Sequence, residues 1–207
     1  ASAVLNDSEA TQQEVDAQLA IIEACIEQYK AAMSTGYTYG AMDGIQNWTE
    51  DEAASMNGFS SVYSISDQCL VGGAKQSLKL TANSASNRFC FATQKKTGAF
   101  STMNPFKITN EADGKLSDYE GIAIAFSDEN GDPIEITKFT ARLMRDSSDW
   151  GSYWNFEANY TDFSTCYANG YYHLNFADFP ALAGAIDDVS ILSILFYKDI
   201  KTGDVAY

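Results

Sequence analysis

Two segments in the second half of the chain alternate strictly between apolar and polar side chains. The apolar positions of residues 153–159 are Trp154, Phe156 and Ala158. Those of residues 171–176 are Tyr172, Leu174 and Phe176. Because successive side chains of a strand point to opposite faces, each segment predicts a strand with one core face and one outward face. The outward positions are Tyr153, Asn155, Glu157, Asn159, Tyr171, His173 and Asn175.

The remainder of the chain after residue 44 has a similar character. Further strands are predicted at residues 60–66, 76–82, 88–93, 106–110, 121–127, 134–144 and 191–197. Turn-forming clusters separate them, at residues 71–74, 83–87, 128–133 and 168–170. Many short strands without intervening helices predict an all-β domain, a β-sandwich of the jelly-roll type, over residues 45–207.

The N-terminal part of the chain predicts a helix. We expect a loose terminus at residues 1–10, an amphipathic α-helix at residues 11–36 and a connector at residues 37–44. The helix begins with a capping box of Thr11 and Glu14. Its apolar stripe consists of Val15, Leu19, Ile22, Ile26, Tyr29 and Met33. We expect the stripe to pack within the chain and the protein to be a monomer, because a coiled-coil dimer needs about three heptads or more.

The charge of the chain restricts its partners. With 13 Lys and Arg against 28 Asp and Glu, the formal net charge is −15. This predicts no nucleic-acid partner, since phosphates require a basic patch, and it disfavours anionic membranes. No apolar run approaches the roughly 20 residues that span a bilayer. An acidic surface does not repel a neutral ligand.

Neither the cysteines nor the acidic turns form a recognisable metal motif. Cys25, Cys69, Cys90 and Cys166 lack zinc-site spacing; they allow three disulfide pairings or none, of which reduced thiols are favoured, with Cys90 buried in a strand. The segment 128–132 imitates the start of a calcium loop, but no bidentate glutamate follows, which favours a hairpin turn.

The same alternation assigns individual side chains to faces. Within residues 134–144, the core positions are Phe139, Ala141 and Leu143, with Arg142 and Met144 pointing outward. Ala123 and Ala125 are expected to form the outward floor of a groove. Trp154 is assigned to the core, Trp150 to a ligand-accessible loop, and His173 to the surface as a hydrogen-bonding residue rather than a catalytic base.

Four sequence segments resemble segments of a known protein family. They are Gly72-Gly-Ala-Lys-Gln-Ser-Leu-Lys-Leu80, Leu116-Ser-Asp-Tyr-Glu-Gly-Ile-Ala-Ile124, Tyr171-Tyr-His-Leu-Asn-Phe-Ala-Asp-Phe179 and Asp187-Asp-Val-Ser-Ile-Leu-Ser-Ile194. Their order is similar to that in jelly-roll carbohydrate-binding modules of bacterial (ruminococcal or clostridial) polysaccharide-degrading systems, of cellulosome or amylosome type. The resemblance implies a non-catalytic module of a larger secreted or cell-surface protein, tethering it to plant polysaccharide. Such modules often hold structural calcium through an acidic pair that follows the equivalent of Val205-Ala-Tyr207. Residues 1–207 contain no clear calcium motif, so no cofactor is expected, and a structural calcium ion stays an open alternative.

The outward faces suit a neutral sugar polymer. A pyranose ring packs its C–H face on an aromatic ring, and its hydroxyls require paired donors and acceptors. We expect a glucan, β-glucan rather than starch. The expected binding residues are Arg142, Trp150, Tyr153, Asn155, Glu157, Tyr171, His173 and Asn175. Two alternatives stay open: a protein-binding adhesion or scaffold module, and a polysaccharide lyase or glycosidase, for which no pair of carboxylates stands out.

Overall fold

The computed structural model describes residues 11–34, 39–40, 49, 53–54, 56–57, 60–71, 74–95, 108 and 113–207. The chain divides into two compact units, Ala1–Tyr39 and Gly40–Tyr207. The predicted N-terminal segment 1–10 lies outside the described residues, and so do the predicted connector, apart from residues 39–40, and the predicted strand at 106–110, apart from Ile108.

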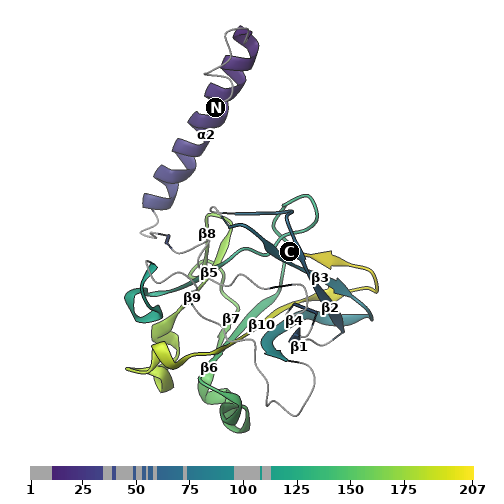
Figure 1. Ribbon diagram of the computed structural model, residues 1–207, viewed down its shortest axis with the longest axis vertical. Coiled ribbons are helices and arrows are strands. Elements are labelled where there is room, and N and C mark those ends of the chain that lie inside the picture. The colour runs from purple at the N-terminus through teal and green to yellow at the C-terminus, as the bar shows by residue number, and fades with distance from the viewer. Residues whose placement is uncertain are drawn as a thin grey trace. The chain divides into compact units, whose positions relative to one another are not determined.

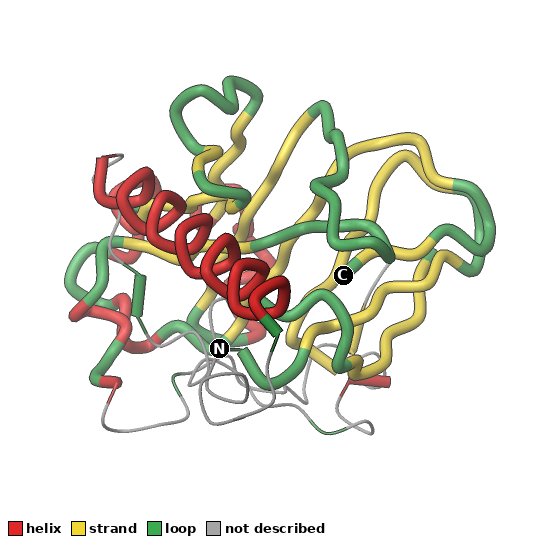
Figure 2. Tube along the Cα trace, turned by 90° about the horizontal axis from the view of Figure 1, so that it is seen from above, coloured by secondary structure: helices red, strands yellow, loops and turns green. Residues whose placement is uncertain are grey.

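The first unit contributes the α-helix α2, Gln12–Ser34, which confirms the predicted helix (Figure 2). The carbonyl of Thr11 accepts a hydrogen bond from the Val15 amide, and the Gln12 side chain donates one to Asp16. Among the stripe residues whose side chains are described, all are exposed on the helix: Val15, Leu19, Ile22 and Ile26. Packing of this stripe against the rest of the chain stays a prediction, because the two units are described separately.

The second unit is built from three antiparallel sheets, which confirms the all-β prediction (Figure 1). The first has the order β1 (Met56–Asn57), β4 (Ser86–Lys95), β10 (Ile191–Ile200), β6 (Lys138–Met144) and β7 (Glu157–Tyr160). The second has the order β11 (Val205–Ala206), β3 (Ser77–Ala82) and β2 (Ser61–Ser66). The third has the order β5 (Gly121–Ile124), β9 (Tyr171–Asn175) and β8 (Tyr167–Ala168). Short 3₁₀ helices connect strands: η2 (Leu116–Asp118), η3 (Ser147–Phe156), η4 (Phe176–Asp178), η5 (Pro180–Leu182) and η6 (Ile186–Asp188).

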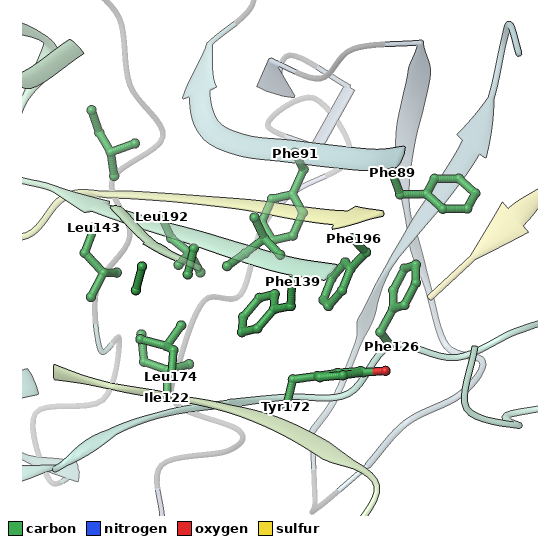
Figure 3. Packing of buried hydrophobic residues seen from close by; sticks show 14 of the residues in the cluster. Phe89, Phe91, Ile122, Phe126, Phe139, Leu143, Tyr172, Leu174, Leu192 and Phe196 are labelled. Atoms are coloured by element: carbon green, nitrogen blue, oxygen red, sulfur yellow. The ribbon is translucent and has the colours of Figure 1, made fainter. Parts of the chain in front are cut away.

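Much of the core lies between the five-stranded sheet and the sheet of β5, β9 and β8 (Figure 3), and Tyr63, Leu80 and Ala206 of the remaining sheet belong to the same cluster. Phe139, Ala141 and Leu143 are fully buried, as predicted for one face of β6. Across the core, Tyr172 and Leu174 of β9 are buried too, and the Phe139 and Tyr172 ring centroids lie 5.7 Å apart. Apolar side chains from both sheets therefore leave water together, which is the main stabilisation of the unit.

Met144 differs from its predicted outward position. Its side chain is fully buried, and so is Ile191, its partner across the β6–β10 pair. The outward face of β6 is therefore covered at its Met144 end, so a side chain that points away from the core is not exposed there.

The predicted strand at residues 153–159 is wrong in its first half. Residues 153–156 belong to η3, and β7 begins only at Glu157. η3 consists of two short 3₁₀ helices separated at Ser152, whose φ of −142° and ψ of 36° are non-helical; the Asp146 side chain accepts the Ser148 amide and caps the first, and residues 153–156 belong to the second. As a result Trp154, assigned to the core, is 63% exposed, whereas Phe156 and Ala158 are buried as expected.

Two of the predicted turns are confirmed. Asn169 and Gly170 both have positive φ, 57° and 84°, and join β8 to β9 in the manner of a type I′ hairpin turn. At residues 128–133, the Asp128 carboxylate accepts the amides of Asn130 and Asp132, and Ser127 pairs with Pro133. This carboxylate is thus used to close a turn.

Candidate functional site

A continuous hydrogen-bond network covers one face of β6 and β7. Arg142 lies directly opposite Glu157 and Thr140 opposite Asn159 in the strand pairing. Arg142 Nε donates to Glu157 Oε2 at 2.7 Å, and Asn159 Nδ2 donates to Glu157 Oε1 at 2.8 Å. Thr140 Oγ1 in turn donates to Asn159 Oδ1 at 2.8 Å. Four side chains from two strands therefore hold one another in fixed orientations.

Glu157 is held as a carboxylate by this network. Burial acts to raise its pKa, but the hydrogen bonds from Asn159 and Arg142 outweigh burial and bring the pKa below its ordinary value. A carboxyl group in this state accepts hydrogen bonds. It is poorly suited to donate a proton near neutral pH.

Aromatic side chains from η3 lie against the same network. The guanidinium carbon of Arg142 is 4.4 Å from the ring centroid of Tyr153 and 5.9 Å from that of Trp150. The rings of Tyr153 and Trp154 are 5.7 Å apart at an interplanar angle of 71°. Tyr153 is 38% exposed and Trp154 63% exposed, whereas Trp150 is half-buried. Open ring surface is thus placed beside a fixed set of donors and acceptors.

The position of η3 is secured at its base by Asp149. This buried carboxylate accepts hydrogen bonds from the Arg145 guanidinium and from the Arg145 amide. Hydrogen bonds from Arg145 lower the pKa of Asp149 despite its burial. The Asp149 carboxylate, which accepts hydrogen bonds from both the backbone and the side chain of Arg145, thus fixes the turn that presents Tyr153 and Trp154.

The predicted residues on β9 form a different group. His173 is only 9% exposed, so its expected role as a surface residue is wrong. Its Nδ1 lies 3.3 Å from the Cys166 carbonyl oxygen, and its amide donates to the same oxygen at 2.7 Å, so the residue before β8 is bonded to this part of β9. Burial lowers the pKa of His173, against the opposing effect of the Cys166 carbonyl. Tyr171 is half-buried, and the Asn175 side chain is exposed and caps η4 through the Ala177 amide.

The eight predicted site residues do not form one face. Arg142 alternates with Phe139, Ala141 and Leu143 on β6, so it points away from the core that these residues fill. His173 alternates with Tyr172 and Leu174 on β9, so it also points away from that core, on the opposite side. The structure brings together Arg142, Trp150, Tyr153 and Glu157, and it separates them from Tyr171, His173 and Asn175. Asn155 is exposed on η3.

Sequence reasoning missed or misassigned three residues of this arrangement: Thr140, Trp154 and Asn159. Asn159 belongs to the same alternating face as Glu157 and carries the signal. Trp154 was misassigned because a strand is predicted where η3 lies. The spacing of Asp146 and Ser148, typical of a helix cap, indicates only where η3 begins. Ala123 and Ala125, the predicted groove floor, are half-buried, and Ala123 lies opposite His173.

Comparisons of the chain with protein-family models, with curated proteins and with solved structures find no match. In the described ranges, no group of three or more His, Cys, Asp or Glu side chains is placed to hold a metal ion. Within the same part of the chain, no helix has the length and apolar character of a membrane span. Cys69, Cys90 and Cys166 are free thiols, and Cys90 is buried in β4 as predicted.

Proposed function

We propose that this chain is a non-catalytic module that binds neutral plant glucan through the β6–η3 surface. This surface is defined as Arg142, Tyr153, Trp154, Glu157 and Asn159, and the buried Thr140 supports it through its hydrogen bond to Asn159. The observation that carries the proposal is the placement of two exposed rings next to a chain of fixed polar groups. An aromatic ring accepts the C–H face of a pyranose, and amide, carboxylate and guanidinium groups match its hydroxyls.

The fixed orientation of the polar groups favours binding. Arg142, Glu157 and Asn159 are already bonded to one another, and Arg142 also stacks on Tyr153. Little side-chain freedom is therefore lost when a ligand arrives, and a ligand hydroxyl meets acceptors and donors in known positions. Trp154 offers the larger open ring face and is the expected stacking platform.

A binding role is favoured over glycoside hydrolysis by the state of Glu157. A general acid in that reaction needs a raised pKa, whereas the pKa of Glu157 is lowered and its carboxylate is engaged by Arg142 and Asn159. The net charge of −15 is compatible with an uncharged ligand and unfavourable for a polyanion.

The wider context belongs to the same proposal. We take the β-rich unit to be a jelly-roll sandwich that acts as a monomer within a larger secreted or cell-surface protein, tethering it to its substrate. The four sequence segments that resemble the family favour β-glucan over starch. The angle of 71° between Tyr153 and Trp154 suits a single glucan chain better than a flat crystalline surface, since the two rings share no plane.

Affinity electrophoresis tests the proposal. Native gels containing barley β-glucan, xyloglucan, glucomannan, xylan or starch are run with the protein and with Trp154→Ala. The expected result is retardation by a β-glucan, lost in the variant, without release of reducing sugar. Absence of retardation in every gel would overturn the proposal and favour a protein-binding adhesion or scaffold module.

A further inference from the structure

A separate groove lies on the sheet formed by β11, β3 and β2. Its volume is about 540 Å³, within the range of roughly 300–1,000 Å³ that is usual for small-molecule sites. It follows β2 and β3, two neighbouring strands that are labelled in Figure 1. We call it the β2–β3 groove, and its lining residues are Ser64, Ile65, Ser66, Asp67, Gln68, Lys75, Gln76 and Lys79.

The chemistry of the β2–β3 groove differs from that of the β6–η3 surface. Hydroxyls, amides and two ammonium groups line it, together with one carboxylate and one aliphatic side chain, and no aromatic ring is among its lining residues. Such a lining matches a ligand that carries many hydroxyls and one negative group. Stacking on a ring has no part in its recognition.

The wall of the groove is fixed by hydrogen bonds around Gln68. The Tyr207 hydroxyl donates to Gln68 Oε1 at 2.7 Å, and the Ser77 hydroxyl donates to the Gln68 carbonyl at 2.6 Å. The Gln68 amide donates to Ser66 Oγ at 3.1 Å. The loop after β2 is thus tied to β3 and to the segment after β11, so the groove exists before a ligand enters.

Lys79 supplies the positive charge at a defined place. It lies opposite Ser64 in the β2–β3 pair, and its Nζ is 5.7 Å from the ring centroid of Tyr207. Among the residues that the structure describes, Lys79 forms no ion pair with a carboxylate, although acidic residues outnumber basic ones 28 to 13 in the chain. A half-buried lysine in a polar groove, with no carboxylate partner among the described residues, favours an anionic partner from outside the chain.

We propose that the β2–β3 groove binds the carboxylate of a uronic acid unit in an otherwise neutral oligosaccharide, with Lys79 as its principal contact. Lys75 adds a second ammonium group, while the serine and glutamine side chains bond the sugar hydroxyls. A ligand with one charge is compatible with the acidic chain, because charges more than about 8 Å away are largely screened at physiological salt. A densely charged polymer would be repelled.

The test uses two probes that differ by one group. The first is a xylo-oligosaccharide whose single charged group is a glucuronic acid branch, and the second is the same compound after reduction of that carboxylate to an alcohol. Calorimetric titrations are made with Trp154→Ala as the parent, so that binding at the β6–η3 surface does not contribute. The parent is compared with Lys79→Gln in that background. Lys138→Gln is the matched control, because the Lys138 ammonium also lies over a tyrosine ring, 5.1 Å from that of Tyr197, on another sheet.

We expect the parent to bind the uronate probe about tenfold more tightly than the reduced probe, and to lose the difference as salt rises. Lys79→Gln is expected to abolish the difference, and Lys138→Gln to preserve it. Equal affinity of the parent for both probes would overturn the proposal, as would a difference that survives Lys79→Gln. The β6–η3 surface is tested separately by the neutral glucan gels, so failure of one proposal leaves the other intact.

Discussion

Arg142 binds Glu157 across the β6–β7 pair through a 2.7 Å hydrogen bond, and it does so with the same guanidinium that stacks on Tyr153. One side chain therefore joins a sheet to the 3₁₀ segment that follows β6. The arginine and glutamate side chains are only 15% and 17% exposed, so water replaces this contact poorly if one partner is removed.

Removal of the arginine is expected to destabilise the β-rich unit. Arg142→Met leaves the Glu157 carboxylate without its charged donor, and we expect a loss of about 1–3 kcal/mol in the free energy of unfolding. Urea denaturation at neutral pH measures this loss. Replacing Glu157 by Gln in the same chain is expected to restore part of it, since the charge left without a partner is removed. A loss below about 0.5 kcal/mol in Arg142→Met would show that the ion pair is dispensable.

The two aromatic groups are expected to respond differently to truncation. Trp154→Ala removes an exposed ring from the β6–η3 surface and is expected to weaken glucan binding at least tenfold, about 1.4 kcal/mol, with little change in melting temperature. Tyr171→Ala lies on the other side of the shared core and is expected to leave affinity unchanged. Titration with a soluble β-glucan oligosaccharide distinguishes them. Loss of affinity in Tyr171→Ala alone would place the glucan on β9 instead.

His173, the single histidine of the chain, makes stability depend on pH. Its folded-state pKa is lowered by burial, so the unfolded chain binds the proton more readily. Stability is therefore complete above the ordinary pKa of about 6.5 and is lost as pH falls from there toward the lowered folded-state pKa. Urea denaturation at pH 7.5 and 5.5 measures the difference. His173→Asn retains a donor near the position of Nδ1 and is expected to reduce the pH dependence of the unfolding free energy. An unchanged pH dependence in this variant would show that carboxylates, and not His173, cause it.

The turn between β8 and β9 provides a test of backbone conformation alone. Gly170 has a φ of 84°, and nothing lies within 4 Å of a Cβ added there. Gly170→Ala is expected to cost about 1–2 kcal/mol in unfolding free energy, because the penalty arises only from left-handed backbone. Gly151→Ala, equally free of neighbours and without positive φ, is the control and is expected to be neutral or slightly stabilising. Equal effects in the two variants would contradict this explanation.

Local patterns in the sequence predicted much of the fold. The strands β2, β3, β4 and β10 follow from alternation and turn residues, and each observed bound differs from the predicted one by at most three residues. The core face of β6 follows from the same period of two, because Phe139, Ala141 and Leu143 meet the core directly. Local sequence patterns were therefore sufficient to predict those strands whose alternating side chains meet the core directly.

The site was harder to predict because its arrangement is non-local. Residues 153 to 156 alternate like a strand, yet they form the second 3₁₀ helix of η3, beyond the kink at Ser152 and outside the turn that Asp146 caps. His173 is buried and lies against the Cys166 carbonyl oxygen, a contact outside β9 that no pattern within β9 reveals. Alternation shows that Arg142 and His173 both point away from the core. It does not show that their strands belong to different sheets, because that depends on which strands pair.

The segment η3 begins after the last residue of β6 and ends before the first residue of β7, so it is an insertion between two neighbouring strands. Its ring-bearing part can change in length and composition while both strands keep their partners. If the β6–η3 surface binds glucan as proposed, divergence of ligand preference would therefore concentrate in residues 151–155, beyond the Asp149 anchor, and a library randomised there is the starting point for changing which polysaccharide is bound.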